Sequence, residues 1–235
     1  MKVILASLLS LFSMVTFAQQ YVVDPNAQVR ILNSGFSAIK VSGGIDLFLS
    51  QSANEAVAVS ASESKYSDDI KTVVENNVLK IYVDGKNWSV KNKKFKVYVS
   101  FKSLESLGAS GACDVKVSGQ INVSSLKLNM SGSSDFEGAV NLKSLSVNLS
   151  GASDIKISGK ATAVTIESSG ASDVKGKDLI AETCTATASG ASDINITVNK
   201  EISATASGAS SIKYYGSAAA GKMVKTGASS IEKKG

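Results

Sequence analysis

The sequence predicts an all-β protein, a right-handed parallel β-helix (β-solenoid) with coils of about 19 residues. Three observations support this fold class: a corner motif that recurs at a nearly fixed interval, two-residue alternation on both sides of it, and composition. The 235 residues include 19 glycines and one proline. Ser, Ala and Val are plentiful, whereas Glu, Leu and Arg, which long helices favour, are few.

The corner motif is clearest at Ser150-Gly151-Ala152-Ser153-Asp154. Seven copies place their glycines 18 to 21 residues apart, at Gly111, Gly132, Gly151, Gly170, Gly190, Gly208 and Gly227. Five copies end in an aspartate: Asp114, Asp135, Asp154, Asp173 and Asp193. We expect glycine to supply the backbone dihedral of a tight corner and serine to satisfy backbone groups. A repeat this short cannot enclose a core alone, so the copies must stack on one another.

Apolar and polar residues alternate strictly before each corner, as in Leu145, Val147 and Leu149 with Ser146 and Asn148 between them. This period indicates a strand with one buried and one exposed side. The same alternation resumes after the corner, so each coil holds at least two strands, and right-handed winding is the default for parallel crossovers. The inward residues shrink to Cys184, Ala186 and Ala188, which predicts a tapering interior. The outward residues form a candidate binding face: Asn129, Asn148, Thr165, Thr185, Thr187, Ser203 and Thr205.

Residues 1–18 are predicted to be a secretory signal peptide. Lys2 precedes an apolar run that is too short to span a bilayer, and a small residue, Ala18, stands at the expected cut. No cysteine stands directly after the cut, so no lipoprotein anchor is expected, and no later stretch is long and apolar enough for a membrane span. We therefore expect an exported protein in the periplasm, on the outer cell surface or outside the cell.

Residues 19–105 are predicted to form an N-terminal β region with irregular early coils, and residues 106–235 the regular β-helix. Residues 34–43 match residues 150–159 in frame, which places an early corner at Ser34-Gly35. Residues 61–94, which include Trp88, would then be an excursion that covers the N-terminal end of the stack. A separate small β-sandwich stays open as the alternative.

The charge pattern and the absence of histidine narrow the function classes. The formal charge is +5, but Arg30 is the only arginine and the lysines lie near aspartates throughout the repeats, so no nucleic-acid partner is expected. Without histidine there is no Ser-His or Cys-His catalytic system and no His-rich zinc site. Because the aspartates fall once per coil, we interpret them as corner formers held by their own turns and by nearby lysines. We expect no enzyme activity, no cofactor and no metal requirement.

Cys113 and Cys184 are predicted to be free thiols. Cys113 replaces a corner serine, whereas Cys184 occupies an inward position several coils later. At one strand spacing of about 4.8 Å per coil the two residues are too far apart for a disulfide, which needs Cα atoms within about 7 Å.

Several segments together resemble the "head GIN domain" family of "putative autotransporter adhesins". They are the opening Phe36-Ser37-Ala38-Ile39-Lys40-Val41-Ser42-Gly43-Gly44-Ile45-Asp46, the strand Val78-Leu79-Lys80-Ile81, and the serial Ser-Gly-x-x-Asp coils. The resemblance covers about residues 30–230 and implies a parallel β-helix with an adhesin-like role, without a demonstrated activity. The expected function is contact with a surface glycan or protein, with homo-oligomerisation left open. A polysaccharide-acting β-helix enzyme and a purely structural envelope protein are the alternatives.

Overall fold

The computed structural model describes residues 24–84 and 94–235, which form a β-solenoid. The predicted signal peptide at residues 1–18 and Trp88 lie outside these residues. The described residues form one sheet of 17 strands and one short 3-10 helix, η1 (Ser64–Asp69). The first strands are β1 (Gln28–Arg30), β2 (Ala38–Ser42), β3 (Ile45–Gln51), β4 (Ala56–Ala61), β5 (Ile70–Glu75), β6 (Val78–Val83), β7 (Phe95–Phe101) and β8 (Ser106–Ser110). The later strands are β9 (Asp114–Asn122), β10 (Ser125–Met130), β11 (Asp135–Leu149), β12 (Asp154–Ser168), β13 (Asp173–Ala188), β14 (Asp193–Ala206), β15 (Ser211–Tyr215), β16 (Ala219–Lys225) and β17 (Ser230–Lys233).

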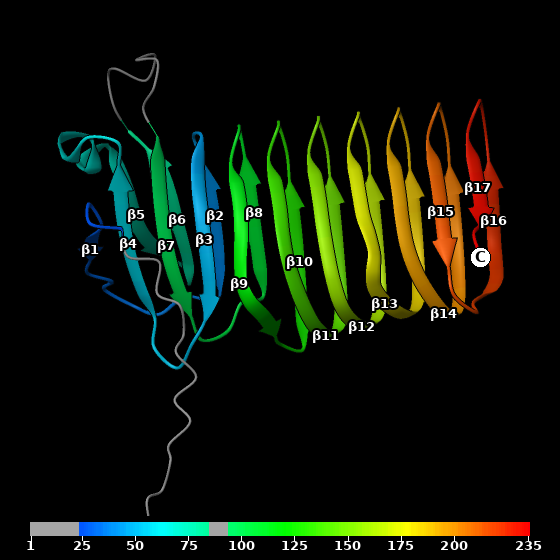
Figure 1. Cartoon of the computed structure of the whole chain (residues 1–235), viewed down its shortest axis with the longest axis horizontal. Helices are drawn as coiled ribbons and strands as arrows, with labels where there is room; N and C mark the ends of the chain where they lie inside the picture. Colours follow the sequence, from blue (N-terminus) through cyan, green and yellow to red (C-terminus); the bar gives the residue numbers. More distant parts are fainter. Residues whose placement is uncertain (1–23, 85–93) are drawn as a thin grey trace, which may run out of the picture.

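The regular coils are stacked strands that pair in parallel, with register shifts between β9 and β11, between β12 and β13, and between β13 and β14. Phe136 pairs with Ile155 and Leu145 pairs with Val164, so one coil is one 19-residue step of the sequence. Strands β11 to β14 each run down one side of the solenoid, bend, and return up the other side toward the next corner (Figure 1). The predicted parallel β-helix with coils of about 19 residues is therefore confirmed.

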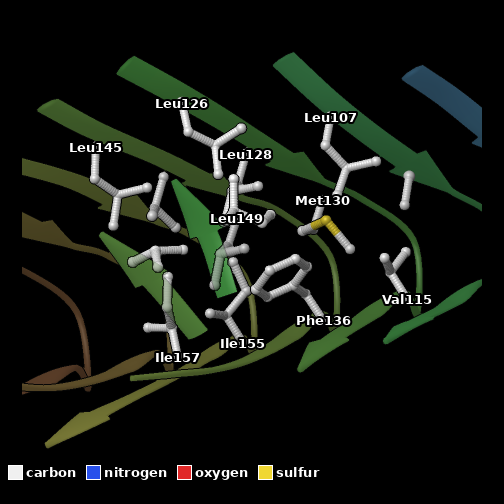
Figure 2. Packing of buried hydrophobic residues seen from close by; sticks show 14 of the residues in the cluster. Leu107, Val115, Leu126, Leu128, Met130, Phe136, Leu145, Leu149, Ile155 and Ile157 are labelled. Carbon is white, nitrogen blue, oxygen red and sulfur yellow. The ribbon is translucent and has the colours of Figure 1, made fainter. Parts of the chain in front are cut away.

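The core lies between the two sides of each coil and is apolar throughout. Leu126, Leu145, Phe136 and Ile155 point into this interior from successive strands (Figure 2). Toward the C-terminus the equivalent inward residues Cys184, Ala186 and Ala188 are also buried. The predicted narrowing of the inward column is thus present in side-chain size.

The seven corner glycines all have positive φ angles, between 73° and 89°. This left-handed conformation disfavours any residue with a Cβ atom. At Gly151 an added Cβ would also lie 2.5 Å from the carbonyl oxygen of Gly132, the corner glycine of the coil before. Glycine is therefore required at the corners by both backbone conformation and stacking distance.

The N-terminal strands belong to the same sheet as the regular coils. Strand β2 pairs in parallel with β6 and β8, and β3 pairs in parallel with β7 and β9. Strands β1, β4 and β5 are antiparallel to their neighbours and lie at the N-terminal end of the stack (Figure 1). Within the described part of 61–94, η1, β5 and β6 thus form this end.

The predicted corner at Ser34-Gly35 is wrong. Because Ser42 pairs with Ser110 and Asp46 pairs with Asp114, the early corner is Ser42-Gly43-Gly44-Ile45-Asp46. Gly43 has a φ of 95°, as the corner requires. A frame eight residues earlier preserves the alternation of apolar and polar residues, which is why the pattern alone allowed it.

Candidate binding face

The predicted binding residues lie together on one outer side of the solenoid. We call this side the polar face: it is the outward side of the strands that precede the corners, namely β6, β2, β8, β10 and the second halves of β11 to β14. Thr165 pairs with Thr185, which pairs with Ser203, and Asn129, Asn148, Glu167, Thr187 and Thr205 form the adjacent column. Thr165, Thr185 and Thr187 are exposed, and Asn129, Asn148, Ser203 and Thr205 are half-buried. The strand alternation therefore places all seven residues where a ligand can reach them.

Hydrogen-bonding capacity differs along the polar face. The side chain of Asn148 donates to Oδ1 of Asn129 over 3.1 Å, and the Oγ of Ser203 accepts the backbone N–H of Lys222 over 3.3 Å. The hydroxyls of Thr185 and Thr187 bond to no other residue in the ranges 24–84 and 94–235. These two hydroxyls are available to donate to and accept from a bound molecule.

Two open hollows lie on the polar face. One has a volume of about 230 Å³ and includes Asn148, Glu167 and Thr187 in its lining. The other has a volume of about 510 Å³ and lies nearer the N-terminal end, where Lys40, Lys80, Tyr82, Gly108 and Asn129 contribute. Of these five, only Asn129 belongs to the predicted face. The sequence signal for the hollow is Gly108, which stands in the outward position that asparagine occupies one coil later.

The five predicted aspartates form a column on the opposite outer side, just after the corners. Asp114, Asp135, Asp154, Asp173 and Asp193 pair in register, and Asp46 of β3 extends the column by one coil. We call this side the charged face. The column shows that the aspartates are a repeated feature of the coils.

The aspartates do not form the expected hydrogen bonds within their own turns. Instead, Oδ1 of Asp135 accepts the backbone N–H of Asp154 over 3.2 Å, and Oδ1 of Asp154 accepts that of Asp173 over 3.3 Å. These bonds run between coils because the parallel register brings each carboxylate beside the next backbone N–H. The carboxylates therefore join neighbouring coils.

Lysine side chains neutralise the negative charge of the aspartate column at only some of its positions. Lys175 Nζ lies 2.8 Å from Oδ2 of Asp154, and this bond raises the pKa of Lys175. Lys156 is one of the lysines that were expected to offset the charge of a nearby aspartate. It pairs instead with Glu137 at 2.7 Å and so lowers the pKa of Glu137. Burial, followed by the charge of Asp154, raises the pKa of Asp173. Asp173 is thus a carboxylate whose charged form is disfavoured.

The fourth residue of the corner motif points inward, and these residues form a ladder of hydrogen bonds between coils. The sequence pattern did not distinguish them from the other corner serines. Ser134, Ser153, Ser172, Ser192 and Ser210 are buried. The Oγ of Ser172 donates to the carbonyl of Ser169 over 3.0 Å and accepts the backbone N–H of Ser153 over 3.3 Å. Cys113 occupies the same position, and its thiol contacts the carbonyl of Ser110 at 3.3 Å. In the sequence, this ladder corresponds to the small serine or cysteine side chain at the fourth position of every copy of the motif.

The described residues offer little nucleophilic or metal-binding chemistry. Within residues 24–84 and 94–235, no group of three or more His, Cys, Asp or Glu side chains is arranged to hold a metal. Cys113 and Cys184 are free and buried, and burial raises the pKa of both thiols, that of Cys184 to about 12. The same ranges contain no helix with the length and apolarity needed to cross a bilayer. What the arrangement does offer is a long hydrogen-bonding surface.

Comparison with known proteins identifies related sequences and folds. The family described as "Putative auto-transporter adhesin, head GIN domain" matches residues 35–218. No curated protein matches the chain. The crystal structure of a putative adhesin from Bacteroides fragilis is 20% identical, with a TM-score of 0.81 over 88% of this chain and 96% of that chain.

Two structures from Parabacteroides distasonis also share the fold. One, a putative lipid binding protein, is 22% identical, with a TM-score of 0.67 over 90% of this chain and 98% of that chain. The other, a putative adhesin, is 20% identical, with a TM-score of 0.71 over 88% of this chain and 97% of that chain. At these identities the likeness shows a common β-solenoid.

Proposed function

The chain belongs to the head GIN domain family of putative autotransporter adhesins, and from that premise we propose that it is an exported, non-enzymatic adhesin. In this proposal the polar face contacts a polymer on a cell surface, with a glycan as the first candidate. The single observation that carries the proposal is the row of outward Ser, Thr and Asn side chains, exposed or half-buried, that share one side of successive coils.

The polar face has the chemistry that a carbohydrate requires. Sugars present many hydroxyl groups at short intervals, and Thr185 and Thr187 offer hydroxyls that have no partner among residues 24–84 and 94–235. Equivalent side chains recur at the strand spacing of about 4.8 Å, so successive units of a polymer can meet similar groups. Solenoids commonly bind through such extended faces.

Export is supported by the N-terminal segment of the sequence. Lys2 and the apolar run that follows it have the order of a secretory signal, and an adhesin must leave the cytoplasm to meet its partner. We place the mature protein in the periplasm, on the outer surface or outside the cell.

The test is binding of the purified mature protein to a glycan array and to cells. The variant Thr185→Lys with Thr187→Lys places two bulky charged side chains on the polar face, and we expect binding to weaken at least about tenfold. Both residues are exposed, so the coil should keep its melting temperature. The matched control is Ser118→Lys with Asn195→Lys, which adds the same two charges to the charged face.

Two results would refute the proposal. Binding that persists in this variant, and in the equivalent changes at Thr165, Ser203 and Thr205, would show that another surface is used. A wild-type protein that binds no array glycan, and whose deletion leaves cell adherence unchanged, would remove the adhesin function itself.

A further inference from the structure

The larger hollow of the polar face includes an outward position without a side chain, Gly108. Lys80, Lys40, Gly108 and Asn129 pair in register on β6, β2, β8 and β10, so they form one outward column. At Gly108 this column has no side chain, and a Cβ added there would have only Lys40 Cγ closer than 4.0 Å, at 3.7 Å. The hollow around Gly108 is open and has a volume of about 510 Å³, which is within the usual size of a small-molecule site.

The hollow is positively charged. Lys40 and Lys80 line it, and none of the described lining residues is acidic. Lys40 forms no ion pair with any residue in the ranges 24–84 and 94–235. Lys80 contacts Glu75, but both side chains stay about half exposed, at 45% and 55%, so the pair is weak and open to exchange. Two ammonium groups on one side of the hollow therefore favour an anion.

The remaining lining groups suit a sugar ring. Tyr82 lines the hollow and keeps 37% of its surface exposed, so it offers an aromatic body with a polar tip. Oδ1 of Asn129 accepts from Asn148, while the amide NH₂ of Asn129 donates to no other residue in the described part of the chain. Ser42, Ser110 and Ser131 add hydroxyls in the column next to Gly108.

We propose that this hollow, the Gly108 hollow, is the specificity site of the adhesin and takes a carboxylate-bearing sugar, a hexuronate unit of an acidic surface glycan. The carboxylate lies between Lys40 and Lys80, the ring packs against Tyr82, and the sugar hydroxyls meet Asn129 and the serines. This inference rests on the proposed function and adds the class of glycan to it.

The test uses tetragalacturonate as the probe and its methyl ester as the uncharged control, with affinities measured by isothermal titration calorimetry. Wild-type protein should bind the free acid at least tenfold more tightly than the ester. Lys40→Gln with Lys80→Gln should weaken binding of the acid at least tenfold, since each charge-assisted bond to the carboxylate is lost. Gly108→Leu should also abolish binding by filling the hollow, and its ordinary contact distance to Lys40 predicts a folded protein.

The matched control is Lys127→Gln. Lys127 is an exposed lysine on the same face that does not line the hollow, and this change removes one charge from β10. It should leave binding within about twofold. Circular dichroism melting curves confirm that each variant is folded.

Equal binding of acid and ester, absence of binding to the acid, or full binding by Gly108→Leu would each overturn the proposal. These failures differ from failure of the adhesin function. If the polar-face variant Thr185→Lys with Thr187→Lys loses binding to neutral array glycans while the Gly108-hollow variants do not, the polar face binds and only the uronate assignment is wrong.

Discussion

Successive corners are joined by backbone hydrogen bonds, from the residue after one glycine to the carbonyl of the glycine one coil before. The backbone N–H of Ala171 donates to the carbonyl of Gly151 over 2.8 Å, and that of Ala152 donates to Gly132 over 2.7 Å. The same carbonyls occupy the space where a Cβ would lie. At the residue scale, the backbone contacts at the corner therefore leave room for glycine alone.

We predict that Gly151→Ala destabilises the protein far more than Gly119→Ala. Both glycines have left-handed φ angles, 82° and 79°, but a Cβ at Gly151 would lie 2.5 Å from a backbone oxygen, whereas one at Gly119 would meet nothing within 4 Å. Gly119→Ala should cost about 1–2 kcal/mol of unfolding free energy from strain alone. Gly151→Ala should cost more than about 3 kcal/mol. Urea denaturation measures both, and equal losses would show that stacking adds nothing.

We predict that Asp173→Asn raises the melting temperature at pH 7. The pKa of Asp173 is raised in the folded protein by burial and by Asp154, so the folded state binds this proton more tightly than the unfolded state. Stability from this group is therefore present below its ordinary pKa of 3.8 and is lost as pH rises through the folded pKa. The gain in Asp173→Asn should shrink as the pH approaches 3.

Asp154→Asn is the control for this change. It alters a carboxylate in the same column but removes the ion pair with Lys175, so it should give no gain in melting temperature at pH 7. A similar gain in both variants would mean that general repulsion along the column, and not the surroundings of Asp173, sets the effect.

At the scale of the element, neighbouring coils are joined by side-chain ladders as well as by backbone bonds. The buried serines join coils inside the corner, and the aspartates join coils outside it. Both ladders depend on the parallel register, since equivalent residues stand one strand spacing apart. Each coil is therefore fixed to the next at its corner from two sides.

We predict that Ser172→Ala lowers the unfolding free energy by about 1–3 kcal/mol, because it leaves the buried N–H of Ser153 and the part-buried carbonyl of Ser169 without this partner. Ser150→Ala removes an exposed hydroxyl that bonds to no residue within 24–84 and 94–235, and it should cost less than about 0.5 kcal/mol. Urea denaturation again decides. Equal effects would show that the ladder is dispensable.

We predict that the aspartate column needs no calcium. Backbone N–H groups and Lys175 already serve Asp135 and Asp154, and Ser211 and Ser230 continue the column without a carboxylate. Melting curves in EDTA and in millimolar calcium should coincide. A rise in melting temperature with calcium that is abolished by Asp154→Asn with Asp173→Asn would show that the column is a metal site.

The strand pattern and the corner glycines were predictable because they repeat. Six copies of Ser-Gly and one of Thr-Gly, with alternating neighbours, determine where strands turn and which side of each strand is buried, and the polar face follows from the same alternation. Ser34-Gly35 was misassigned because alternation has a period of two, so an even shift of frame leaves it intact. The pairings of β2 with β8 and of β3 with β9 distinguish the true corner.

The Gly108 hollow and the partners of the aspartates could not be predicted from the repeat. The hollow needs β6, β2 and β8 side by side, although β2 and β8 are separated in sequence by the whole N-terminal excursion. The bond from Asp135 to the N–H of Asp154 depends on a local distance between coils. Both features arise from contacts between segments, which a pattern within one segment does not contain.

At the scale of the whole molecule, the solenoid has two unlike outer sides. The polar face carries hydroxyl and amide groups, with the lysines of the Gly108 hollow near its N-terminal end. The charged face carries the aspartate column beside Lys156, Lys175 and Lys213. A neutral ligand would therefore meet the hydroxyl and amide groups of the polar face, and an anionic ligand would meet the two lysines of the Gly108 hollow on the same face.

We predict that both cysteines resist alkylation until the whole molecule unfolds. Cys113 and Cys184 are buried and free, and burial raises the pKa of Cys184 to about 12, so little thiolate is present at pH 8. Mass spectrometry after iodoacetamide treatment should show no label on the native protein and two labels under denaturing conditions without reductant. A mass two daltons low with no label would reveal a disulfide and a different coil register.

Because successive coils pair with one another in parallel, the number of coils determines the length of the solenoid. Since β12 pairs in parallel with both β11 and β13, one further unit of about 19 residues could be added beside it with both ends of the solenoid unchanged. Each such unit would extend the polar face by about 4.8 Å. The length of the solenoid measured from its N-terminal end would thus change in steps of one strand spacing.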